Sequence, residues 1–74
     1  MIELAWKPIR IATALHNFLP EEACEEIQAM GTLAAAVRVA REYLEKDQEF
    51  SGRTPLEVFQ EVGLPDDVYE LGDK

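Results

Sequence analysis

Apolar residues between positions 33 and 44 recur with the period of an α-helix, and this pattern constrains the fold more than any other feature. They stand four, three and four residues apart, at Leu33, Val37, Ala40 and Leu44. Side chains at this spacing share one face of a helix and can be buried together. Residues of opposite charge stand four apart elsewhere on the segment, at Arg38, Glu42 and Lys46 and again at Arg41 and Glu45. The pattern predicts a long amphipathic helix over residues 32–48.

Proline, glycine and capping residues divide the rest of the chain into shorter helices. Proline suits the first turn of a helix, and Thr54-Pro55-Leu56-Glu57 has the form of a capping box. The predicted helices span 8–19, 20–30, 32–48, 55–62 and 65–71. We therefore expect an all-α protein in which residues 1–74 form a single helical domain. Its architecture is a compact bundle of four to five short helices with an extended N-terminal arm.

The arm is predicted over residues 1–7, where apolar and other residues alternate. Ile2, Leu4 and Trp6 stand two apart, which is the period of a half-buried strand. No second strand pattern follows in the sequence, and an isolated pair of strands is weak in water. Two arrangements stay open: the arm folds back onto the bundle, or it pairs with a second copy or a partner.

Chain length and cysteine usage limit how such a protein is stabilised. A domain of 74 residues buries only about 60% of the surface that its unfolded chain exposes. Cys24 is the only cysteine, which excludes an internal disulfide and fits a reducing compartment. No apolar run approaches the roughly 20 residues of a membrane span. We expect a cytoplasmic protein that does not bind membranes.

The charge is strongly negative and unevenly distributed. Residues 1–20 carry Glu3 against Lys7 and Arg10, a net charge of +1, and residues 21–74 carry fourteen acids against five bases, a net charge of −9. These sum to the −8 of the whole chain. Such a field repels phosphate backbones and disfavours direct nucleic-acid binding. It favours a basic protein partner, although acidity alone also serves solubility.

Candidate catalytic residues are few. The only imidazole is His16 and the only thiol is Cys24, on consecutive predicted helices where a Cys–His pair is geometrically conceivable. Cys24 falls on the apolar stripe of its helix, however, and a cysteine there behaves as a small hydrophobe. A di-metal site of the Glu-x-x-His type is absent, since no carboxylate stands three residues before His16. We expect no enzymatic activity, no cofactor and no metal.

Candidate partner-binding residues lie in the arm and on the outer side of the long helix: Trp6, Ala35, Arg38, Val39 and Glu42. Small apolar groups at Ala35 and Val39, four residues apart, would allow another helix to approach closely. Residues 21–46 also have the helix–turn–helix form of some DNA-reading proteins. Of the residues that the second helix would present to DNA, only Arg38 could contact a base edge, and the alternative is that the two helices simply stack on each other.

One short segment resembles a known family. Gly52-Arg53-Thr54-Pro55-Leu56-Glu57 is similar to the Gly-Arg-Thr-Pro-Leu-Glu segment at the toxin-binding end of Xre/ParS-type bacterial antitoxins. The similarity covers six residues, and a capping box alone would produce much of it. The tryptophan expected upstream and a separate DNA-binding domain are both missing from this sequence. The resemblance implies a small regulatory partner and no more.

The leading hypothesis is a small acidic, noncatalytic regulatory protein, such as an inhibitor, an antitoxin-like factor or an adaptor, that binds protein through its helix surfaces and can form a homodimer. A second hypothesis is a phage-type acidic mimic of nucleic acid that blocks a basic groove of a host defence or transcription protein. A third is a subunit of a small homo-oligomer that binds a ligand between subunits.

Overall fold

The computed structural model describes residues 7–73. Within them the chain forms five α-helices and one turn of 3-10 helix. These are α1 (Pro8–Leu15), α2 (Glu21–Gln28), α3 (Leu33–Ser51), α4 (Pro55–Glu61), α5 (Asp66–Glu70) and η1 (Leu71–Asp73). No strand occurs in this part of the chain, which confirms the all-α prediction. The predicted arm and Trp6 lie outside the described residues, apart from Lys7, which has an extended backbone before α1.

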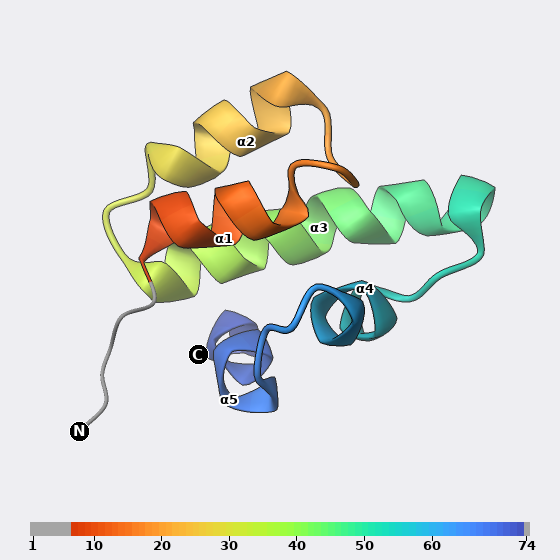
Figure 1. The fold of residues 1–74 in the computed structure, drawn as a ribbon. Helices are drawn as coiled ribbons and strands as arrows, with labels where there is room; N and C mark the ends of the chain where they lie inside the picture. Colours follow the sequence, from red (N-terminus) through yellow and green to blue (C-terminus); the bar gives the residue numbers. More distant parts are fainter. Residues whose placement is uncertain (1–6, 74) are drawn as a thin grey trace.

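The long helix α3 is the spine of the molecule, and the other elements pack on two sides of it (Figure 1). α1 and α2 run antiparallel to each other and both contact one side of α3. α4, α5 and η1 contact α3 from the other side. Residues 33–44 of α3 therefore bury apolar side chains against both groups of helices, and this burial explains the apolar repeat in the sequence.

The core is built from apolar side chains of every α-helix. The largest side chains that are fully buried in it are Ile11, Leu15, Ile27, Val37, Leu44 and Phe59. Phe59 of α4 meets Tyr69 of α5 edge to face, with ring centroids 5.0 Å apart. This geometry is favoured for aromatic pairs, and it joins the two short C-terminal helices beneath α3.

Helix starts follow the signals in the sequence closely. The capping box at Thr54 is complete: the Glu57 N–H donates to Thr54 Oγ1 at 3.2 Å, and the Thr54 N–H donates to Glu57 Oε1 at 2.8 Å. Thr32 caps α3 by accepting the Ala35 N–H at 3.1 Å. These hydrogen bonds satisfy amide groups that the first turn of a helix leaves without partners.

Two helix ends differ from the predicted positions by three residues or more, and the other three by one or two residues. α1 ends at Leu15 instead of residue 19, and the Phe18 N–H closes a turn onto Leu15 O at 2.8 Å. α3 continues to Ser51, three residues beyond the predicted end. It stops there because Gly52 adopts a left-handed backbone with φ of 76°, and its N–H donates to Gln48 O at 2.8 Å. Only glycine takes this conformation readily, so Gly52 marks the end of the helix.

Candidate partner-binding surface

The residues predicted from the sequence on α3 share one face of the helix but differ in exposure. Arg38 and Glu42 are exposed, whereas Ala35 and Val39 are half-buried. Val39 packs against the hydrophobic core, so only part of its side chain can reach a partner. The structure therefore offers a polar face here, with apolar groups recessed between charged ones. Trp6, the remaining predicted residue, lies outside the described part of the chain.

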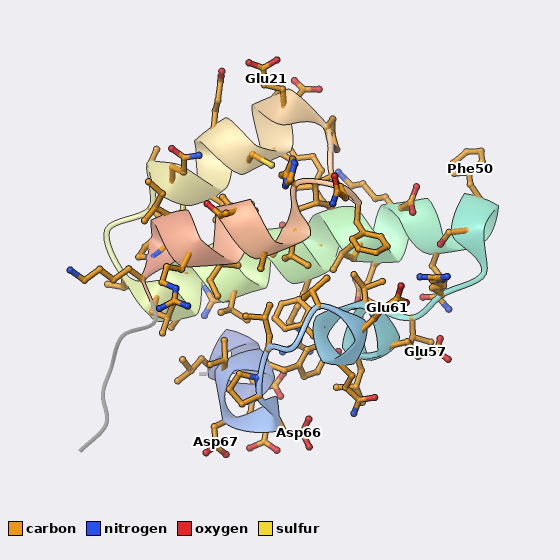
Figure 2. The ribbon with its side chains drawn as sticks, in the orientation of Figure 1. Glu21, Phe50, Glu57, Glu61, Asp66 and Asp67 are labelled. Atoms are coloured by element: carbon orange, nitrogen blue, oxygen red, sulfur yellow. The ribbon has the colours of Figure 1, made fainter. Side chains whose placement is uncertain are left out.

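Large exposed apolar side chains are rare in the described residues. Ile9 of α1 is 55% exposed, Leu56 of α4 is 38% exposed, and Phe50 of α3 is 87% exposed. Figure 2 shows Phe50 projecting from the last turn of α3, clear of the other helices. An aromatic ring held in this way on a regular helix is the kind of group that anchors protein–protein contacts.

Phe50 continues a row of residues that begins inside the molecule. Val39, Tyr43, Lys46 and Phe50 stand four, three and four apart and so lie on one face of α3. Along this row, exposure increases from Val39 and Tyr43, which pack against the core, to Lys46 and Phe50, which are exposed. The row thus passes from a covered part of α3 to an uncovered part of the same helix.

Tyr43 links this row to α2. Its hydroxyl donates a hydrogen bond to Glu26 Oε1 at 2.8 Å, and the Lys46 Nζ lies 5.5 Å from the centre of its ring. The hydrogen bond to Glu26 raises the pKa of Tyr43, and desolvation and the negative charges of Glu26 and Glu22 add to the effect. The covered part of the row therefore already lies in a negative field.

Further carboxylates surround the exposed end of α3. Asp47 stands one turn before Phe50 and Glu49 immediately before it, and the last turn contains no basic residue. The C-terminal end of a helix carries partial negative charge, so acids there are destabilising and bases are favourable. We define the Phe50 surface as the side chains of Tyr43, Lys46 and Phe50 together with the carboxylates of Glu22, Glu26, Asp47 and Glu49.

Arg41 has a structural role that the charge pattern did not predict. The spacing on α3 predicts Glu45 as its partner. Instead, its Nη1 donates to Tyr69 O at 3.1 Å and to Asp73 Oδ1 at 3.0 Å. Its guanidinium also lies 4.2 Å from the centre of the Tyr69 ring. Arg41 thus holds α5 and η1 against α3.

The thiol and the imidazole do not form a pair in the structure. Cys24 is buried in the core, with its Sγ 3.8 Å from Ala12 O. Burial raises the pKa of the Cys24 thiol, and the nearby charge of Glu21 raises it further. His16 is exposed, and its Nδ1 lies 3.1 Å from Thr13 O, a position from which an Nδ1–H donates. Cys24 is therefore a core residue, as its place on the apolar stripe predicts.

Sequence reasoning missed Phe50 as a candidate because it ended the helix at residue 48. Gly52 is the signal that could have corrected this, since glycine is the usual residue just after a helix. With α3 extended to Ser51, the spacing from Tyr43 places Phe50 on the same face but beyond α2.

Comparisons with models of protein families, with curated proteins and with solved structures find no match to this chain. Among residues 7–73, no three His, Cys, Asp or Glu side chains gather closely enough to hold a metal ion. The helices of this part of the chain include none with the length and apolar character needed to cross a membrane.

Proposed function

We propose that this chain is a noncatalytic binding protein that regulates another protein through contacts on its helical surface, as an inhibitor, an antitoxin-like factor or an adaptor does. The observation that carries the proposal is the exposure of Phe50, an aromatic side chain held 87% exposed on a regular helix. An exposed aromatic ring contributes no burial free energy to folding, whereas burying it against a partner contributes binding free energy.

Two further observations support this function. The thiol of Cys24 is buried and the imidazole of His16 bonds locally, so neither is positioned as a nucleophile or base for the other. The net charge of −8 favours a basic protein over a nucleic acid or an anionic membrane. The single cysteine fits a reducing compartment, and we place the protein in the cytoplasm as part of the proposal.

The proposal is tested by capture with the purified full-length chain, followed by reconstitution from two purified proteins. We expect the chain to form a complex of defined mass with one folded protein, measured by light scattering. The chain alone should turn over no small-molecule substrate. Failure to form a complex with any protein at low or moderate salt would overturn the proposal. Stoichiometric retention of a small ligand or a metal by the purified chain would overturn it as well.

Surface variants show which face is used. Ala35→Arg and Glu42→Lys alter the face of α3 predicted from the sequence, and Phe50→Ser alters its exposed end. Val39→Glu is not a clean test, because the Val39 side chain packs against the core and a buried charge would destabilise the fold. Loss of the complex with one variant, at unchanged helicity in circular dichroism, assigns the surface.

A further inference from the structure

The exposed end of α3 contains one feature that adds nothing to the stability of the folded chain and one that lowers it. Phe50 leaves an aromatic ring in water, and Asp47 and Glu49 place negative charge at the negative end of the helix dipole. Acidic residues also stand in the last turns of α2, α4 and α5, so the combination of acidic residues with an exposed aromatic ring is what sets the end of α3 apart. Local conflicts with folding rules concentrate at functional sites in natural proteins.

Resting on the proposed function, we propose that the Phe50 surface binds a cationic amphipathic segment of another protein. Apolar side chains of that segment cover Phe50, and its Lys and Arg side chains meet the carboxylates of Asp47, Glu49 and Glu26. The partner thereby supplies the two groups that α3 lacks at this end: an apolar cover for the ring and positive charge at the helix C-terminus.

The charge of the surface argues for this occupant over the alternatives. Its four carboxylates and the single ammonium of Lys46 give a net charge of −3, from Glu22, Glu26, Asp47 and Glu49 against Lys46. Two copies of the chain that met through this surface would bring these carboxylates together, and like charges across an interface are costly. Phosphate groups of a nucleic acid or a membrane would be repelled in the same way.

The position of the surface also suits an elongated partner. α2 contacts α3 through the hydrogen bond between Tyr43 and Glu26, and α3 continues past the start of α2 to Ser51 (Figure 1). A segment docked on Lys46 and Phe50 would extend the packing that α2 begins on this face of α3. Helix-in-groove recognition uses anchors at this spacing of three and four residues.

The test uses a phage-displayed library of random peptides about 16 residues long, selected against the purified full-length chain. We expect the enriched peptides to combine Lys or Arg with apolar residues. A synthetic peptide from this set should bind with an affinity that falls between about 50 and about 200 mM salt. Selection of neutral or acidic peptides, or no enrichment at all, would overturn the proposal.

Matched variants locate the binding site. Phe50→Ser, and separately the double variant Asp47→Lys with Glu49→Lys, should each weaken binding of the peptide by about tenfold or more. Ile9→Ser removes another exposed apolar side chain, and Glu25→Lys changes the charge of an exposed position on α2. Both controls should retain affinity within about twofold. Equal binding by the Phe50→Ser protein and the unmodified protein would rule out this site.

Two outcomes separate this inference from the function on which it rests. A folded partner that binds the unmodified chain and the Phe50→Ser variant equally would leave protein binding intact and reject the Phe50 surface. A dimer in light scattering that Phe50→Ser dissociates would show that a second copy occupies the surface, which also contradicts a cationic partner. Every variant is first shown to keep its helicity and to unfold at a urea concentration no more than slightly below that of the unmodified protein.

Discussion

The two parts of α3 obey different rules although they belong to one continuous helix. In residues 33–44 the apolar side chains are buried or half-buried, and Arg41 bonds to Tyr69 O and Asp73. From residue 45 to Ser51 every side chain except Asp47 is exposed, including Phe50. The first part contributes to the core, whereas the second holds an exposed aromatic ring and acidic residues at the helix C-terminus.

This difference between the two parts of α3 separates residues that stabilise the fold from residues that we propose for binding. A chain of this size has only a few kcal/mol of net stability, so features that cost free energy need a compensating role. In the first part of α3 each residue type serves the fold. In the last two turns the residue types add little to the fold and suit the partner binding that we propose.

The largest expected effect concerns the core beneath the first part of α3. Phe59 is fully buried against Tyr69, and Phe59→Ala should cost about 3–5 kcal/mol in the free energy of unfolding. A loss of this size is expected to abolish cooperative unfolding in urea, followed by circular dichroism. The exposed neighbour Gln60 is the control, since Gln60→Ala should change stability by less than about 0.5 kcal/mol. Similar stability of the two variants would contradict the packing described for α4.

The next effect concerns the attachment of the C-terminal segment by Arg41. A Cβ on Gly72 would lie 2.7 Å from Arg41 Nη1 and 2.8 Å from Arg41 Cδ. Gly72→Ala should therefore displace the arginine and destabilise the protein by about 1–3 kcal/mol. In an Arg41→Ala background the same change should cost much less, because only Val37 Cγ1, at 3.3 Å, would remain close. A double-mutant cycle in urea measures this coupling, and additive effects would contradict the contact.

A smaller effect of opposite sign is expected at the exposed end of α3. Glu49→Lys replaces an unfavourable charge at the helix C-terminus and should raise the free energy of unfolding by about 0.3–1 kcal/mol. Glu49→Gln should give a smaller gain, and both gains should shrink at high salt as the charges are screened. Thermal denaturation followed by circular dichroism compares the three proteins. A loss of stability in the lysine variant would mean that Glu49 serves the fold.

The smallest effect is a pH dependence at the covered part of the Phe50 surface. The pKa of Tyr43 is raised from its usual 10.0, mainly because the neutral hydroxyl donates to Glu26. The folded state therefore binds the phenolic proton more tightly than the unfolded state, so its contribution is present below pH 10.0 and is lost as the pH rises above it. Tyr43→Phe should be less stable than the unmodified protein at pH 7, and the difference should narrow above pH 10.0. A difference that is constant with pH would contradict the hydrogen bond.

Much of the fold can be predicted from local signals in the sequence. Pro8, Pro20 and Thr54-Pro55 locate helix starts to within one residue, because proline and capping side chains act on the amides nearest to them. Helix ends are harder to predict. α1 stops at Leu15 without glycine or proline there, since residues 16–19 turn to place Leu19 in the core.

Less of the candidate surface can be predicted. Glu45 stands four residues from Arg41 on the same helix, but Arg41 bonds to Tyr69 O and Asp73 because of how the C-terminal segment folds back. The exposure of Phe50 likewise depends on where α2 begins relative to the end of α3. Both are consequences of tertiary packing between segments far apart in the sequence, which spacing along one helix does not encode.

The free energy of unfolding of Phe50→Ser tests the central claim most directly. Phe50 is 87% exposed in the structure, so its removal should leave stability in urea within about 0.5 kcal/mol of the unmodified protein. Buried phenylalanines replaced by small residues lose about 3–5 kcal/mol, as expected at Phe59. A loss above about 1 kcal/mol at Phe50 would show that its ring packs within the fold, and the end of α3 would then be part of the core rather than a binding surface.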